Sequence, residues 1–422
     1  MDHLEAFLNF VEQSPTAFHA VANLAEDLRR AGFRELKEKD PWLVDAGGRY
    51  FVVRNDSAVI ALAIPRSGFG PFRIAAAHSD SPSFKLKPRF EDPAEGAYVR
   101  LNVEPYGGGI LSSWLDRPLS VAGRLVLRQG EGVETRLVNL DRDAVLIPNM
   151  PIHFNRSVNE GYAWNPQVDL LPLYGQEKTE GGLMRELAEA AGAAPEAVLA
   201  HDLFLYSRQP GSIWGAEDAF FSCGRIDDLE CAWGCMQPLM TCEARDAICV
   251  CAVFNNEEVG SLSRQGADSS FLYDTLTRVG FALGASDGEI RAAMADGFMV
   301  SADNAHALHP NHPEKYDREN RVYMNKGVVI KHNANQKYTT DAVSGAMFTL
   351  MCEKAGVPVQ HFSNRSDIPG GSTLGNISNS HVSMNTVDIG LAQLAMHSVC
   401  ETAGVKDLDY LIQALKTFWS EE

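Results

Sequence analysis

The chain has 422 residues, of which 45% are hydrophobic and 22% charged, and its formal net charge is −18. This composition is typical of a globular protein long enough for two domains and a large core. The acidic balance argues against nucleic acid or an anionic membrane as the main partner, and no apolar run approaches the length of a membrane span. No signal peptide is recognisable, and the eight cysteines follow neither a disulfide nor a zinc-finger spacing, so we expect a cytoplasmic protein with reduced thiols.

The first part of the chain predicts helices followed by strands. Apolar residues at helical spacing indicate two amphipathic helices between residues 2 and 31. Residues 49–54 and 58–64 predict a β-hairpin, and residues 72–77 predict a further apolar strand. This last strand leads directly to His78, which is therefore expected at a strand end.

The pattern of apolar and turn-forming residues changes between residues 89 and 213. Short strand-like runs alternate there with Gly, Pro and Asp, and one segment, residues 183–191, has a helical pattern. This pattern predicts a mainly β domain that is inserted into the first domain. We therefore expect a discontinuous α/β domain over residues 1–88 and 214–422, and an inserted β domain over residues 89–213.

Strands and helices alternate in the remainder of the chain, which predicts a three-layer αβα sandwich. Strand-like runs lead to Glu257 and to Asp303, and helical patterns cover residues 341–355, 391–401 and 408–419. The carboxyl ends of the strands meet at one edge of an open α/β sheet, which is where such folds bind their ligands.

The most informative segment is the adjacent pair Glu257 and Glu258, which follows an apolar strand-like run over residues 247–254. Two carboxylates at the end of a buried strand repel each other and are costly to bury. A multivalent cation offsets this cost, since one glutamate can bind the metal while the other acts as general base toward a metal-bound water. The alternative is a solvated loop, which is the common environment of glutamate.

Further candidates lie at other strand ends and helix starts. His78 and Asp80 are two residues apart, so Asp80 can hydrogen-bond one imidazole nitrogen and fix which nitrogen meets a metal. Asp227 opens an apolar helical segment, where it can either cap the helix or bridge two metal ions. Asp303 follows another strand, and His397 is expected at the start of an apolar helix, where the alternative is a packed core histidine.

In their order along the chain, these segments resemble the motifs of the M18 family of metallo-aminopeptidases, in particular its bacterial members similar to aspartyl aminopeptidase. The matching segments are residues 77–82, 225–227, 256–260, 301–307 and 393–398. The resemblance covers nearly the whole chain, including the inserted domain. It implies an α/β metallo-exopeptidase domain and an inserted β domain that serves dimerisation.

The resemblance also implies a metal site. It assigns the ligands of two divalent ions: a bridging Asp227, with His78 and Asp303 on one ion and Glu258 and His397 on the other. Glu257 would be the general base, and Asp80 would orient His78. Nitrogen and oxygen ligands without thiolate suit zinc, with cobalt or manganese as alternatives. Binding to a cation would also keep Glu258 ionised.

A substrate and an assembly follow from the same resemblance. The substrate would be a peptide from which the enzyme removes the N-terminal residue, preferably Asp or Glu. Lys331 would meet the acidic side chain of that residue. The alternative for a lysine at a strand end is a surface charge. Gly371 and Ser372 would belong to a backbone loop along the pocket. His153 would either reach into a neighbouring subunit and donate a hydrogen bond to the tetrahedral oxyanion, or pack locally. The assembly would be a tetrahedral homododecamer built from dimers.

Some features leave alternatives open. Asp228 places an extra carboxylate beside the bridging position, where it could alter metal preference. His306, His309 and His312 look metal-rich, but neighbouring prolines predict an irregular loop with structural or pocket-lining histidines. A deacylase or carboxypeptidase-type enzyme with the same catalytic domain is a rival function, and a non-catalytic shell or cargo protein is another. The inserted domain and His153 favour the aminopeptidase over the first rival, and the presence of every ligand and of the base argues against the second.

Overall fold

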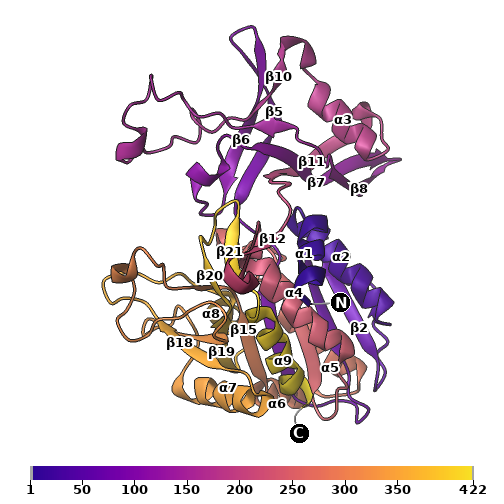
Figure 1. Cartoon of the computed structure of the whole chain (residues 1–422). Helices are drawn as coiled ribbons and strands as arrows, with labels where there is room; N and C mark the ends of the chain where they lie inside the picture. Colours follow the sequence, from indigo (N-terminus) through magenta and orange to yellow (C-terminus); the bar gives the residue numbers. More distant parts are fainter. Residues whose placement is uncertain (1–2, 421–422) are drawn as a thin grey trace.

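The molecule has a lower α/β lobe and an upper lobe built mainly of strands (Figure 1). The computed structural model describes residues 3–420. A nine-stranded sheet forms the centre of the lower lobe, in the order β1-β2-β3-β14-β4-β15-β19-β17-β18. Its strands are β1 (Arg34–Glu35), β2 (Arg49–Arg54), β3 (Ala58–Ala63), β4 (Phe72–His78), β14 (Ile248–Phe254), β15 (Phe298–Ala302), β17 (Val328–His332), β18 (Val359–Ser363) and β19 (Asn385–Gly390).

Helices cover both faces of this sheet, because its central strands are apolar on both sides. Strand β14, for example, is buried over its whole length. One face packs against α1 (His3–Gln13), α2 (Ala17–Arg30), α4 (Ile226–Thr241), α7 (Ala342–Ala355) and α9 (Asp407–Ser420). The other face packs against α5 (Phe271–Ala282), α6 (Asp287–Ala295) and α8 (Leu374–Ser378). The predicted three-layer αβα arrangement is confirmed.

The central strands of the sheet bring distant parts of the chain to one edge. β4 runs parallel to β14 on one side and to β15 on the other, and His78 lies opposite Phe254 in the register. The residues that follow these strands therefore lie close together. The chain enters the upper lobe a few residues after His78, at Ser83, so this edge of the sheet faces the junction between the lobes.

The upper lobe is a seven-stranded sheet that closes on itself, because β11 pairs with both β5 and β7. Its strands are β5 (Ser83–Ala94), β6 (Tyr98–Tyr106), β7 (Pro118–Gln129), β8 (Gly132–Asn139), β9 (Val145–Leu146), β10 (Leu173–Gln176) and β11 (Val198–Tyr206). Helix α3 (Gly182–Ala190) confirms the helical segment expected here. Because β5 begins at Ser83, this sheet starts before the predicted domain boundary between residues 88 and 89.

A five-stranded sheet lies at the waist between the lobes (Figure 1). Its strands are, in spatial order, β12 (Ser212–Trp214), β13 (Phe220–Cys223), β21 (Glu401–Gly404), β20 (Ala392–Leu394) and β16 (Ala305–His306). The helix predicted over residues 391–401 is therefore wrong, since β20, a turn and the start of β21 occupy this segment. Ala395 and His397 have φ angles of 56° and 68°, which an α-helix cannot accommodate. Pairing within the waist sheet overrides the local helical pattern.

The other predicted helices are present. α1 and α2 confirm the N-terminal pair, although residue 2, where the first was expected to begin, lies outside the described residues. α7 and α9 confirm the helices expected near residues 341–355 and 408–419. Among the described residues, no helix is both long and apolar enough to cross a membrane.

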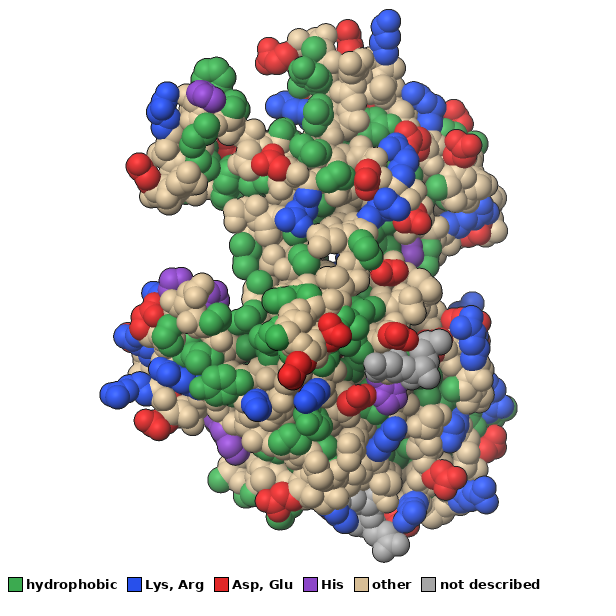
Figure 2. All heavy atoms as spheres, viewed as in Figure 1, with side chains coloured by type: hydrophobic (Ala, Val, Ile, Leu, Met, Phe, Trp, Pro, Cys, Tyr) green, Lys and Arg blue, Asp and Glu red, His purple; other side chains and the backbone are tan. Residues whose placement is uncertain are grey.

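The segment between β9 and β10 extends away from the closed sheet of the upper lobe as an arm (Figure 1). Hydrophobic side chains are visible at the surface of this arm, at the upper left of Figure 2, and the exposed ones include Met150, Ile152, Phe154 and Val168. Phe154 is 82% exposed. Several large apolar side chains exposed on one short segment are typical of a surface that another protein covers.

Candidate metal centre

Side chains from separate segments meet in one pocket of about 520 Å³ at the carboxyl-terminal edge of the nine-stranded sheet. They are His78 at the end of β4, Asp227 in the first turn of α4, Glu257 and Glu258 after β14, Asp303 after β15, and His397 in the turn between β20 and β21. The structure thus brings together every side chain that the sequence suggested as a metal ligand, and places the suggested general base beside them.

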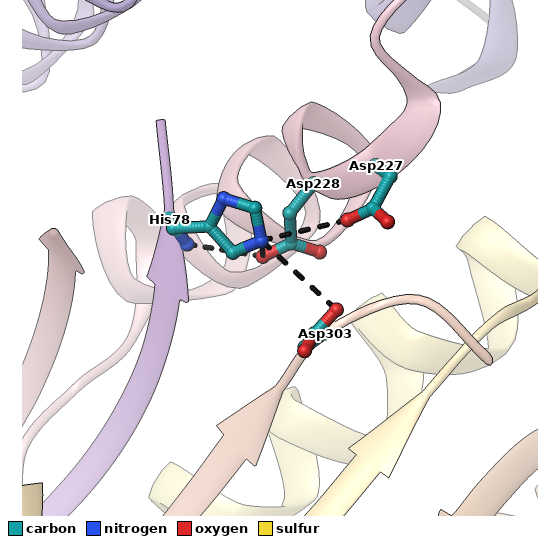
Figure 3. A group of neighbouring side chains, drawn as sticks. All are labelled: His78, Asp227, Asp228 and Asp303. Carbon is teal, nitrogen blue, oxygen red and sulfur yellow. Dashed lines mark hydrogen bonds and ion pairs between the residues drawn. The ribbon is translucent and has the colours of Figure 1, made fainter. Parts of the chain in front are cut away.

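His78, Asp227, Asp228 and Asp303 form the more deeply buried ligand group (Figure 3). Nε2 of His78 lies 3.4 Å from a carboxylate oxygen of Asp227, and 4.0 Å from one oxygen of Asp228 and of Asp303. The four candidate ligand atoms all lie within 4.8 Å of one another, close enough to share one ion. Nδ1 of His78 contacts the backbone oxygen of Asp80 at 3.1 Å and its carboxylate at 3.5 Å, which leaves Nε2 facing the group.

Asp228 also fixes the end of strand β4. One of its carboxylate oxygens accepts a hydrogen bond from the backbone N–H of His78 at 3.0 Å. Its other oxygen is buried without a hydrogen-bond partner among the described residues. Asp228 therefore positions His78, and the oxygen that accepts this bond, Oδ2, is also the one that lies 4.0 Å from Nε2 of His78.

Asp227, Glu258 and His397 form a second ligand group. Nε2 of His397 lies 3.4 Å from an oxygen of Asp227 and 3.4 Å from an oxygen of Glu258. Oδ1 of Asp227 faces His78, whereas its Oδ2 faces His397, so this carboxylate lies between the two groups. The second group is the more open one, because the side chain of His397 is 29% exposed and that of His78 is 1% exposed.

Several oxygens in the two groups lack hydrogen-bond donors. Oδ1 of Asp227, Oδ1 of Asp228 and Oε1 of Glu258 are buried without a donor in the part of the chain that is described. A buried carboxylate oxygen without a partner costs free energy, and a bound cation removes that cost. Imidazole nitrogens and carboxylate oxygens are ligands that zinc, cobalt and manganese accept. The residues present therefore fit a divalent ion in each group.

Burial and crowding also disfavour ionisation of the carboxyl groups. Burial raises the pKa of Glu257 to about 8, and burial followed by the nearby charge of Asp227 raises the pKa of Glu258 well above its ordinary value. Burial alone would raise the pKa of Asp227 as well, but His397 and His78 hold it below its ordinary value. The surroundings thus disfavour the ionised form of the two glutamates, and a nearby cation would favour it.

Asp80 holds the turn that carries the two glutamates. Its carboxylate oxygens accept hydrogen bonds from the backbone N–H groups of Glu257 at 3.1 Å and of Glu258 at 3.2 Å. These donors begin the 3₁₀ turn Glu257–Val259, where backbone N–H groups otherwise lack partners. The spacing of Asp80 and His78 in the sequence suggested their mutual contact, but not this second role.

The substrate-binding residues suggested by the sequence, Lys331, Gly371 and Ser372, line the same pocket. Lys331 is only 3% exposed, so the alternative of a surface charge is wrong. Its Nζ lies 3.7 Å from Oδ2 of Asp303. Burial would lower the pKa of Lys331, but Asp303 and other nearby acidic groups keep it above its ordinary value, so the ammonium is charged. His306 is a further member of the pocket lining.

The structure separates three other histidines from the pocket. His153 is exposed on the arm of the upper lobe, so it neither packs locally nor belongs to the described residues that line the pocket of its own chain. His309 is half-buried and His312 is exposed in a loop, where their rings lie 5.1 Å apart. The interpretation of His309 and His312 as structural residues is consistent with this placement.

Glu401 is a functional residue that the sequence did not reveal. Its carboxylate accepts hydrogen bonds from the backbone N–H of Asp227 at 3.0 Å and from that of His397 at 2.7 Å. It thereby joins the first turn of α4 to the turn between β20 and β21. The signal was hidden because the segment was predicted as a helix, in which the backbone N–H of His397 would bond within the helix and not to the carboxylate of Glu401.

Comparisons with known proteins identify the family of this chain. Residues 10–419 match the family described as Aminopeptidase I zinc metalloprotease (M18). The chain is 43% identical over 422 residues to "Probable M18 family aminopeptidase 2" of Clostridium novyi (strain NT), covering 98% of this chain and 97% of that protein. It is similar to a chain in the structure named "Cryo-EM structure of the Ape4 and Nbr1 complex", with a TM-score of 0.94 and 35% identity over 98% of this chain and 84% of that chain. The structure named "Structure of S. cerevesiae mApe1 dodecamer" has a TM-score of 0.87 and 27% identity, covering 99% of this chain and 96% of that chain.

Proposed function

The chain belongs to the M18 family of metallo-aminopeptidases, which are hydrolases, and we propose that it removes the N-terminal residue of peptides with the help of two divalent ions. The observation that carries this proposal is the position of Asp227, whose two oxygens face two separate groups of ligand atoms. Zn²⁺ is the proposed ion, in agreement with the family description, and Co²⁺ or Mn²⁺ would suit the same ligands.

The proposed chemistry divides roles among the side chains of the pocket. When bound, two such ions would supply Lewis-acid activation of a water molecule and of the peptide carbonyl. Glu257 belongs to neither ligand group, so its carboxylate is free to accept a proton from the attacking water and to return it to the leaving amine. Asp80 keeps Glu257 in place through the backbone of the turn. All of these side chains are present, which argues against a non-catalytic shell protein.

A matrix of metals and substrates tests this function. The chain is stripped with a chelator, reconstituted with Zn²⁺, Co²⁺ or Mn²⁺, and assayed on peptides with free and with acetylated N-termini. We expect hydrolysis of the free-amine peptides alone, and only after an ion is restored. Equal hydrolysis of both kinds of peptide would contradict the aminopeptidase and favour the deacylase or carboxypeptidase-type rival.

We propose that Lys331 selects acidic N-terminal residues by binding the Asp or Glu side chain of the substrate. Its buried ammonium lies in the pocket, and the 3.7 Å contact with Asp303 leaves donors for a second carboxylate. Lys331→Met should lower kcat/KM on acidic N-termini on the order of 100-fold, and on neutral N-termini much less. The exposed Lys315 provides the control variant Lys315→Met. An equal loss on both kinds of substrate would contradict the selection by Lys331.

We propose that assembly completes the site, with His153 of one subunit reaching the pocket of its neighbour to donate a hydrogen bond to the oxyanion. The exposed apolar arm supports this, as does the dodecamer in the name of a similar structure. The assembly would be a tetrahedral dodecamer built from dimers.

Two experiments test the proposed assembly. Phe154→Asp should give smaller species in sedimentation velocity and reduce activity, whereas Val133→Asp, at an exposed site of β8, should not. His153→Ala and Glu257→Gln chains, when dissociated and reassembled together, should regain activity because intact pairs form between unlike subunits. Failure of this mixture to regain activity, while mixed oligomers form, would contradict the role of His153.

We also propose a cytoplasmic location. All of the cysteines are free thiols and most of them are buried, which suits a reducing compartment. Peptides, rather than nucleic acids or membranes, would be the partners of this acidic chain.

A further inference from the structure

A short segment of the upper lobe, residues 106–110, contacts the turns that carry the second ligand group. It begins with Tyr106, the last residue of β6, and continues through three glycines to Ile110, which precedes the 3₁₀ turn Leu111–Trp114. The segment reaches both Asp80 and His397, which come from the lower lobe and the waist sheet.

Tyr106 connects this segment to the turn of the two glutamates. Its hydroxyl donates a hydrogen bond to Oδ2 of Asp80 at 2.7 Å and accepts one from Nδ2 of Asn256 at 2.8 Å. Asp80 in turn accepts the backbone N–H groups of Glu257 and Glu258, and Asn256 directly precedes them. One hydroxyl of the upper lobe therefore constrains both the start of the turn and the carboxylate that holds it.

Gly108 and Ile110 hold His397 from two sides. The backbone oxygen of Gly108 accepts a hydrogen bond from Nδ1 of His397 at 2.9 Å. The backbone N–H of Ile110 donates to the backbone oxygen of His397 at 2.9 Å. With the proton on Nδ1, the lone pair of the neutral imidazole is on Nε2, the atom that faces Asp227 and Glu258.

Gly107 lets this segment approach closely. Its φ angle is +73°, and a Cβ atom at this position would lie 3.1 Å from the Cβ atom of Glu258. A side chain at Gly107 would therefore push against a member of the second ligand group. The buried group depends less on the upper lobe, because His78, Asp228 and Asp303 come from β4, α4 and the end of β15 in the lower lobe.

We propose that residues 106–110 are a positioning element through which the upper lobe sets the geometry of the second ligand group, with Tyr106 fixing the glutamate turn and Gly108 fixing His397. This inference rests on the proposed two-ion function. None of these residues touches the substrate as a catalytic group. Their effect reaches the reaction through Asp80, the glutamate turn and His397.

The first test compares Tyr106→Phe with Tyr174→Phe. Both changes remove one phenol hydroxyl of the upper lobe that donates to a carboxylate, but the partner of Tyr174 is Glu186, which is not part of the pocket lining in the described chain. Zn²⁺ affinity is measured by calorimetry on the metal-free full-length chains. Tyr106→Phe should weaken the lower-affinity site on the order of 10- to 100-fold and leave the other site unchanged, whereas Tyr174→Phe should change neither.

A second pair of variants tests the same proposal in case a variant of the first pair folds poorly. Gly107→Ala and Gly130→Ala both place a side chain at a positive φ, but a Cβ at Gly130 meets nothing within 4 Å. Gly107→Ala should weaken the same Zn²⁺ site, and Gly130→Ala should affect only the melting temperature. The proposal is overturned if Tyr106→Phe and Gly107→Ala bind both ions as tightly as their controls. A wild-type chain that binds two ions but hydrolyses no peptide would overturn the proposed function and leave this test of positioning valid.

Discussion

The two ligand groups that share Asp227 are built in different ways. The buried group takes His78 and Asp303 from the ends of adjacent parallel strands, and hydrogen bonding within the sheet fixes their backbones. The open group takes Glu258 and His397 from turns, and His397 has a φ angle of 68°. Hydrogen bonds from other segments hold these turns in place. The comparison indicates that sheet topology positions one half of the site, and long-range contacts position the other.

The largest effect is expected from a substitution of Asp227, the residue that the two groups share. Asp227→Asn removes a charge from both groups, so we expect the chain to lose affinity for both ions together. Activity should fall on the order of 1,000-fold or more, since several kcal/mol of transition-state stabilisation would be lost. Metal content by mass spectrometry and kcat/KM on a free-amine peptide check this. A variant that still held one ion tightly would show that Asp227 is not shared.

Glu257→Gln separates the chemistry from metal binding. The amide keeps the shape of the side chain but cannot accept the proton, so kcat should fall roughly 10²- to 10⁴-fold. Both ions should remain, because Glu257 belongs to neither ligand group. If activity survived while the metal content was intact, the assignment of Glu257 as general base would be wrong.

Stepwise removal of metal with a chelator compares the affinities of the two groups. His397 is 29% exposed at its side chain and His78 is 1% exposed, so the ion of the open group should leave first. We expect at least about a tenfold difference in affinity, and a range of chelator concentration over which one ion per chain remains. Loss of both ions in a single step would contradict the contrast between the groups.

The smallest effect is expected outside the pocket. His309→Gln together with His312→Gln should leave metal content and kcat/KM unchanged, because neither side chain lines the pocket in the described chain. Loss of an ion in this variant would show that the loop contains a metal site.

The sequence alone predicts the half of the site that depends on regular structure. Apolar runs that end at His78, Glu257 and Asp303 place these residues at strand ends, and strand ends converge in an open α/β sheet. The family resemblance is confirmed by the comparisons, as is the α/β fold. Domain limits, the role of His153 and the count of two ions stay predictions.

The other half could not be predicted from local patterns. Residues 391–401 have the composition of a helix, yet strand pairing and a positive φ at His397 place them in two strands and a turn. Tyr106, Gly108 and Glu401 act through hydrogen bonds to partners as far as 289 residues away in the sequence. No spacing in the sequence encodes such contacts, because they join segments that the fold alone brings together.

The most direct test of the central claim is anomalous diffraction from crystals of the full chain grown with Zn²⁺. The account predicts two peaks per subunit, roughly 3.5–4 Å apart, one on either side of the Asp227 carboxylate. One peak should be bound by His78 and Asp303, and the other by Glu258 and His397. A single peak, or a second peak away from Asp227, would contradict a two-ion site with a shared carboxylate.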